Sequence, residues 1–178
     1  VKNRLISFKV VRKRINKLRS TGVNTVMMAR AAGTQAVTYG YAATGVADSA
    51  LLATKREVAK AAAPTTAWKN PNLVLYTLDA GTGTLDPAFE ANAAGIHSWA
   101  SAWWDKWIPE QQLITAFNAA STTAKKGWNS VSGPVAAMTA TLKRVGWRMT
   151  DATTFVDDLG EVFHVRKDSP EAIRLAVN

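Results

Sequence analysis

The residues best suited to chemistry are two adjacent aspartates, Asp157 and Asp158, which follow Phe155 and Val156. Adjacent carboxylates can hold Mg²⁺ for nucleotidyl transfer. The segments 153–158 and 161–165 are rich in β-branched and aromatic residues and flank Leu159-Gly160, which predicts two strands joined by a turn. The aspartate pair is therefore a candidate metal-binding motif on a predicted hairpin.

Reverse transcriptases carry an aromatic-x-Asp-Asp motif on such a hairpin, but their active site needs more than this motif. It also requires an aspartate on a neighbouring strand and a nucleotide-binding loop. The plausible earlier aspartates are Asp79 and Asp86, and Asp86 has the setting of a helix N-cap. A hairpin with acidic residues near its turn explains the pair more simply. We expect no complete catalytic constellation, so the chain is not predicted to be an enzyme.

The remaining candidate sites are weaker. Residues 75–79 resemble the first strand of an RNase H fold, but the other carboxylates of that site have no obvious places. Residues 81–83, Gly-Thr-Gly, lack the lysine and helix of a phosphate-binding loop. His97 and His164 are distant in sequence and lack the carboxylate spacing of a metal site, and the chain has no cysteine. We predict no metal site and no cofactor.

Positive charge is the second notable feature, with a net charge of +9. Residues 2–19 contain eight lysines and arginines and no acid, and apolar residues recur there at spacings of three and four. This pattern predicts an amphipathic helix with a cationic face, which either is simply solvated or contacts phosphates. The candidate phosphate-contacting residues, here and later in the chain, are Lys9, Arg12, Lys13, Arg14, Lys17, Arg19, Lys143, Arg144, Arg148 and Arg166.

Residues 86–108 contain four of the seven tryptophans and are predicted to form the helix around which the chain packs. Asp86 is a suitable N-cap, with a proline directly after it, and Pro109 is expected to end the helix. The predicted core side chains of this helix are Phe89, Ile96, Trp99, Trp103 and Trp107. Trp104 points elsewhere on the helix and is the candidate for stacking on a base.

The rest of the chain is predicted to be mainly helical. Helices are expected over 24–32, with Gly33 as C-cap, and over 48–63, 110–123, 134–145 and from 170 onwards, whereas 73–78 is either a short strand or a helical turn. We expect a mainly α, compact multi-helix domain with a small C-terminal β-hairpin, in the helix–strand–turn–strand order of a winged helix. A body of residues 1–126 and an appendage of residues 127–178 are expected to form one structural unit.

Composition narrows the class of protein. Apolar residues make up 47% and charged residues 20% of the chain, which is typical of a globular protein. The absence of cysteine argues against a small disulfide-stabilised scaffold. No run of apolar residues is long enough to predict a transmembrane helix. Residues 1–19 lack the apolar core of a secretory signal, but they have the basic, acid-free character of a mitochondrial transit peptide.

Several short motifs occur together in an order that resembles a known type of polyprotein. The motifs are Arg12-Lys13-Arg14 with Leu18-Arg19, Tyr39-Gly40 with Gly45, Lys55-Arg56, Asp86-Pro87-Ala88, Trp99 with Trp103-Trp104, Trp128 with Gly133-Pro134, and Arg144-Val145-Gly146-Trp147. This ordered set resembles a segment of the retrotransposon-type polyproteins abundant in dinoflagellate genomes. There it follows the reverse-transcriptase palm and, in many, precedes an RNase H-like domain. The resemblance implies a thumb-like or connection role that grips template–primer duplex, and it implies no catalytic residues.

The leading expectation is thus a non-catalytic, sequence-independent module of retroelement origin that binds DNA or RNA through the phosphate backbone. Two alternatives stay open. The chain could be a co-opted structural subunit of a large organellar assembly, such as a ribosome or respiratory complex, with other protein subunits as partners. It could also be a reverse-transcriptase fragment that uses Asp157 and Asp158. A retroelement origin favours a nuclear location, and the N-terminal helix is compatible with a mitochondrial one.

Overall fold

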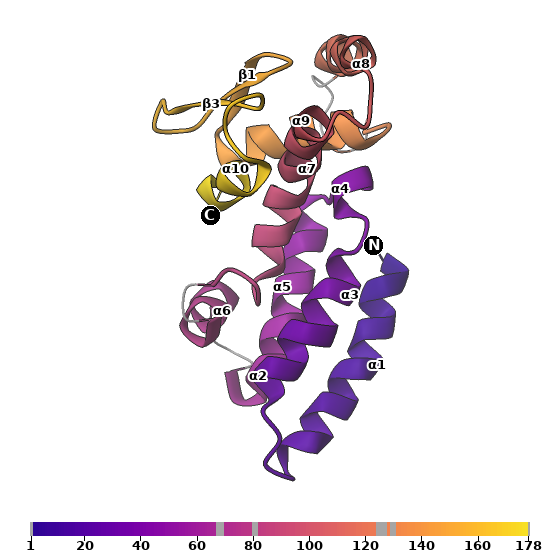
Figure 1. The fold of residues 1–178 in the computed structure, drawn as a ribbon. Helices are drawn as coiled ribbons and strands as arrows, with labels where there is room; N and C mark the ends of the chain where they lie inside the picture. The colour runs from indigo at the N-terminus through magenta and orange to yellow at the C-terminus, as the bar shows by residue number, and fades with distance from the viewer. Residues whose placement is uncertain (1, 67–69, 80–81, 124–127, 129–130, 178) are drawn as a thin grey trace. The chain divides into compact units, whose positions relative to one another are not determined.

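A computed structural model describes residues 2–66, 70–79, 82–123, 128 and 131–177 of the chain. It is mainly helical with a small antiparallel sheet near the C-terminus, which confirms the predicted fold class (Figure 1). The contacts divide the chain into two compact units. The first unit comprises Val1–Tyr39 and Val46–Glu90, and the second comprises Gly40–Gly45 and Ala91–Asn178. The predicted junction between residues 126 and 127 lies outside the described residues.

The first unit is built from helices around one apolar core. Phe8, Ile15, Val58 and Leu75 are among its buried side chains. Its elements are α1 (Lys2–Arg19), α2 (Thr25–Met28), the π-helical segment η1 (Ala29–Thr34), α3 (Gln35–Thr38), α5 (Asp48–Ala62), the 3₁₀ turn η2 (Pro64–Thr66) and α6 (Pro71–Asp79). Helix α5 packs against both α1 and α6, so it lies at the centre of this unit.

The helix predicted over 24–32 begins where expected but does not end there. The Asn24 side chain caps it by accepting from the backbone N–H groups of Val26 and Met27, at 3.1 and 3.2 Å. The chain then stays helical through η1 and α3 instead of ending at Gly33. Gly33 has a packing role: a Cβ there would lie 2.9 Å from Cε2 of the Phe8 ring. The predicted C-cap is therefore wrong, because this glycine allows a close approach to α1.

Residues 73–78, for which the sequence allows either a short strand or a helical turn, lie within helix α6. Asp79, at the end of α6, is buried and organises the turn that follows. Its Oδ1 accepts from the backbone N–H of Leu85 at 3.0 Å and from the Thr82 hydroxyl at 2.7 Å, and it also pairs with Arg30 at 3.2 Å. A buried carboxylate needs such partners to offset its lost hydration. These contacts give Asp79 a structural role in the turn after α6.

The second unit combines helices with the sheet. Its core holds Ile96, Trp99, Met138, Phe155 and Ile173, all buried. Its elements are α4 (Tyr41–Thr44), α7 (Pro87–Trp104) from Ala91 onwards, α8 (Glu110–Thr123), α9 (Pro134–Val145), β1 (Arg148–Asp151), β2 (Thr154–Val156), β3 (Val162–His164) and α10 (Pro170–Ala176). Helix α9 contacts α4, α8 and β1 and so connects the helical part to the sheet.

The tryptophan-rich helix α7 begins as predicted and ends early. Asp86 caps it, with its Oδ1 accepting from the Ala88 N–H at 2.8 Å. The helix ends at Trp104, four residues before the predicted end. Lys106 then adopts a positive φ of 55°, and the chain turns back so that the Trp107 indole donates to the Ser101 carbonyl at 2.6 Å. Trp107 is 61% exposed, so the prediction that it belongs to the core is wrong.

The sheet contains the predicted hairpin and one additional strand. The strand order is β1-β2-β3, with both pairs antiparallel. Phe155 faces Phe163 across the hairpin. The Trp147 ring stacks on the Phe163 ring with centroids 5.4 Å apart, and this packing against the end of α9 helps to set the register.

Candidate nucleic-acid interface

The buried residues of α1 determine which side of this helix faces the solvent. Phe8 and Ile15 are each 2% exposed and face the core of the first unit. Residues about half a turn away from them, such as Lys13 and Lys17, therefore lie on the outer side. Val11 and Leu18 are 37% and 40% exposed, so the inward apolar face is narrower than the sequence pattern predicts.

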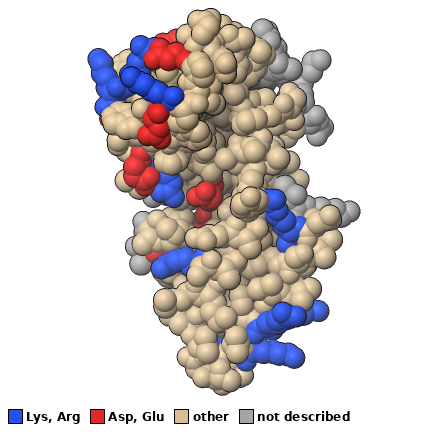
Figure 2. Space-filling model, turned by 45° about the vertical axis from the view of Figure 1, so that its right-hand side comes forward, with Lys and Arg blue, Asp and Glu red and all other residues tan. Residues whose placement is uncertain are grey.

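Arg4 of α1 is exposed and lies over the Tyr39 ring, 4.9 Å from its centroid. The other exposed cations described on α1 are five, and we call them the α1 cluster: Lys9, Lys13, Arg14, Lys17 and Arg19. None of the five forms a salt bridge with an acid among the described side chains. Figure 2 shows lysine and arginine side chains grouped low on this face with no acidic side chain beside them. Like charges this close repel one another, and a polyanion that binds them removes that repulsion.

A non-binding explanation accounts for part of the α1 cluster. Lys17 and Arg19 lie in the last turn, where the helix dipole favours cations. This effect falls off within one turn, so it leaves Lys9 and Lys13 unexplained. Ile6 and Val10 lie on the same outer side and are 54% and 52% exposed. The sequence pattern gave no sign of these exposed apolar residues, because both fall outside the predicted apolar face.

Arg12 differs from its neighbours because it is held by an acid. Its Nε lies 3.0 Å from Oε2 of Glu57 on α5, and Lys60 lies 3.3 Å from Oε1 of the same carboxylate. Glu57 is 8% exposed, so its ion pair with Arg12 helps to hold α1 on α5. The carboxylate is buried and Arg12 is partly buried, so the pair is costly to break, because the remaining charge is left without a partner. Of the candidate contacts on α1, Arg12 is therefore the one with a clear structural task.

The later candidate cations lie in the second unit and are partly engaged. Arg144 lies over the Trp128 ring, 4.2 Å from its centroid, and donates to Oδ1 of Asn92 at 3.4 Å. Arg166 pairs with Glu110 and lies 5.2 Å from the centroid of Trp103. Lys143 and Arg148 are exposed, on α9 and β1. Cation–π contacts leave guanidinium N–H groups able to donate, so these residues keep some capacity for phosphate.

The two adjacent tryptophans of α7 have different environments. Trp103 is 4% exposed and packs edge-on to Trp99, with centroids 6.3 Å apart. Trp104, the candidate for base stacking, is 45% exposed. Part of this indole is therefore in contact with solvent, as stacking on an incoming base requires.

Asp157 closes the hairpin. It is 7% exposed, and its Oδ1 accepts from the backbone N–H groups of Leu159 and Glu161, at 2.9 and 2.7 Å. This is the geometry of an Asx-type turn, in which the side chain replaces a backbone acceptor. Asp158 is exposed and lies at the turn itself. The described residues contain no group of three or more acidic or histidine side chains placed to hold a metal.

Replacing Asp157 by alanine is expected to destabilise the second unit by about 1–3 kcal/mol, because two turn N–H groups lose their acceptor. Asp158→Ala is the matched control and is expected to change stability by less than about 0.5 kcal/mol. Urea denaturation of both variants measures the difference. A metal-binding pair would instead give two variants with equal loss of Mg²⁺-dependent activity and similar stability.

The two histidines occupy ordinary structural positions. His97 on α7 has its Nε2 3.7 Å from a Glu171 carboxylate oxygen, and His164 on β3 has its Nδ1 3.3 Å from the Thr154 hydroxyl.

On β1, the Asp151 carboxylate accepts from the side-chain hydroxyl of Thr153 and also from its backbone N–H. These bonds hold the pKa of Asp151 below its usual value.

A comparison with protein families, curated proteins and solved structures finds no match to this chain. Among the described residues, no helix has the length and apolar character needed to cross a membrane.

Proposed function

We propose that this chain is a non-catalytic module that binds nucleic acid independently of its sequence, with the α1 cluster as the principal phosphate-contacting surface. The observation that carries this proposal is the set of five exposed cations, Lys9, Lys13, Arg14, Lys17 and Arg19, without acidic partners among the described side chains. Phosphate contacts of this kind give affinity without reading bases, because lysine and arginine meet the same backbone at every step.

A role beside a polymerase is the finer form of this proposal. The resemblance to the segment that follows the palm in retrotransposon-type polyproteins supports a thumb-like or connection module that holds template–primer duplex. Arg144, Arg148 and Arg166 of the second unit are candidates for further phosphate contacts, and Trp104 is a candidate for stacking on an unpaired base. Either RNA or DNA suits these contacts, because both present the same phosphates.

Titration of the chain with a fluorescent duplex at two salt concentrations tests the proposal. Five phosphate contacts give a slope of log affinity against log salt of about −4.5, so affinity is expected to fall on the order of 500-fold between about 50 and about 200 mM salt. Duplexes of unrelated sequence are expected to bind with the same affinity and the same slope. Absence of binding at the lower salt concentration would refute the proposal.

A further inference from the structure

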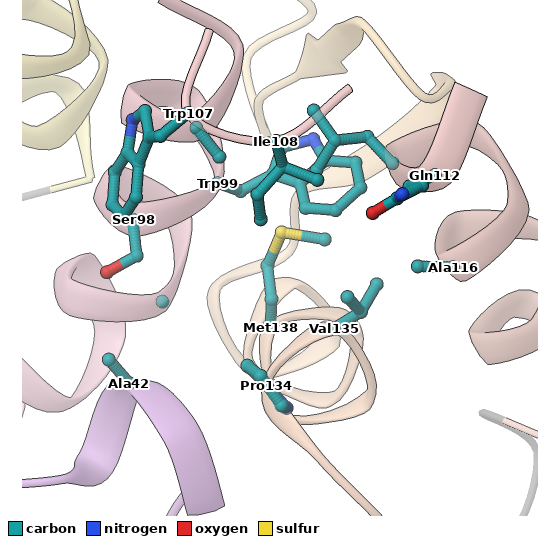
Figure 3. Close-up of a pocket in the computed structure, with 13 residues that line it drawn as sticks. Ala42, Ser98, Trp99, Trp107, Ile108, Gln112, Ala116, Pro134, Val135 and Met138 are labelled. Carbon is teal, nitrogen blue, oxygen red and sulfur yellow. The ribbon is translucent and has the colours of Figure 1, made fainter. Parts of the chain in front are cut away.

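The second unit contains a pocket of about 400 Å³ that the phosphate-contacting residues do not line. Figure 3 shows it between α7, α8 and α9, with the segment that follows α7 along one side. Its walls include Trp99, Trp107, Ile108, Leu113 and Met138, and its other described lining residues are likewise uncharged. Pockets that bind small molecules usually have volumes of about 300–1,000 Å³ and mainly apolar walls.

The two indoles in the wall, Trp99 and Trp107, present ring carbon to the pocket, and both of their N–H groups already donate to backbone carbonyls. The Trp99 N–H is used by the Ala152 carbonyl, at 3.0 Å, and the Trp107 N–H is used by the Ser101 carbonyl, at 2.6 Å. The polar side chains at the pocket are Ser98 and Gln112, which Figure 3 shows on opposite sides of it. A ligand therefore meets aromatic and aliphatic carbon along its length and a hydrogen-bonding group only at its edge.

The wall that contains Trp107 is held by a backbone conformation that costs energy. Lys106 has a φ of 55°, and a residue with a Cβ is disfavoured in this left-handed region. The turn at Lys106 brings Trp107 and Ile108 back to the pocket, where they are 61% and 37% exposed. Two large apolar side chains are thus kept partly in water at the mouth of an apolar pocket. Strained backbone of this kind is concentrated at ligand-binding sites.

We propose that this pocket binds a small, neutral molecule with an aromatic body. Its volume exceeds the cavity of about 150 Å³ that accommodates benzene, so there is room for two or more fused or linked rings. Aromatic rings pack favourably against the two indoles and against the Met138 thioether. Neutrality follows from the lining, because an anion or cation placed there would lose its hydration without gaining an opposite charge.

The probe is N-phenyl-1-naphthylamine, a neutral aromatic dye that fluoresces strongly in apolar surroundings, titrated into the full chain. Saturable binding at one site per chain is expected. The matched probe, 1-anilinonaphthalene-8-sulfonate, has the same aromatic frame with an added negative charge. It is expected to bind more weakly by about tenfold, because no described lining residue carries a positive charge.

The matched variants are on α8. Ala116 lines the pocket, so Ala116→Phe fills it and is expected to lower the affinity for the neutral dye by at least about tenfold. Asn118 is exposed on the same helix and is not a lining residue, so Asn118→Phe adds the same ring elsewhere and is expected to leave affinity unchanged. Melting curves of both variants check that each is folded.

Three results would overturn the proposal: non-saturable fluorescence, equal binding by a folded Ala116→Phe variant, or tighter binding of the sulfonate. Binding of the fluorescent duplex is measured in a separate titration of the same chain. The pocket belongs to the second unit and the α1 cluster to the first, so loss of dye binding and loss of nucleic-acid binding are distinguishable results.

Discussion

Simultaneous replacement of Lys13, Arg14 and Lys17 by glutamine is expected to remove most of the salt dependence of nucleic-acid binding. Each phosphate contact contributes about −0.9 to the slope of log affinity against log salt. With two of the five contacts left, the slope becomes about −1.8, and affinity changes only about 12-fold between about 50 and about 200 mM salt. Fluorescence anisotropy at several salt concentrations measures this slope directly.

The matched control removes the same amount of charge from other places. Arg56, Lys106 and Lys167 are exposed and lie outside α1, so their replacement by glutamine lowers the net charge equally. If phosphate contacts are concentrated on α1, this control keeps most of the slope. An equal loss in both triple variants would mean that overall charge, and not a surface on α1, attracts the polyanion. An unchanged slope in the α1 variant would refute the assignment of the surface.

The sequence predicts the local features of this fold well, because their causes lie within a few residues. The Asp86 cap is one example, and Ser169 is another: its hydroxyl accepts from the Ala172 N–H at 3.2 Å at the start of α10. In both cases a short polar side chain precedes a proline at the first helical position. The helices in residues 2–19 and 48–63 are likewise predicted from the spacing of apolar residues within each segment.

Contacts between residues distant in sequence could not be predicted in the same way. Arg12 looks like its neighbours in the sequence, and only the packing of α1 on α5 brings Glu57 next to it. The role of Gly33 depends on the ring of Phe8 and not on the end of its own helix. Strand β1 is mostly polar and exposed, so the sequence shows no alternation of apolar residues there. Only its pairing with β2 identifies it as a strand.

The pocket was not predictable for the same reason. Its walls come from α4 and from three longer helices, and it depends on a left-handed residue, Lys106, that no sequence signal indicates. A lysine is a poor guide to positive φ, because glycine and asparagine are the residues usually found there. The tryptophan spacing predicts a helix as far as Ile108, and a helix of that length would have no turn to place Trp107 beside the pocket.

Replacement of Trp99 by alanine is expected to destabilise the second unit severely. Trp99 is 5% exposed and packs against Trp103 and Phe117, and its indole N–H bonds the Ala152 carbonyl between β1 and β2. Loss of a buried tryptophan typically costs about 3–5 kcal/mol, and the vacated space enlarges an existing pocket instead of collapsing. Thermal unfolding followed by circular dichroism is expected to show a melting temperature lower by about 10 °C.

Trp104→Ala is the matched control, because it removes the same side chain from the same helix. Trp104 is 45% exposed, so its loss is expected to cost less than about 1 kcal/mol, well below the cost at Trp99. Trp99→Phe separates two causes: it keeps most of the apolar packing but leaves the Ala152 carbonyl without its donor. An intermediate stability for this variant would assign part of the loss to the hydrogen bond. If Trp99→Ala and Trp104→Ala were equally stable, α7 would not be the helix around which the second unit packs.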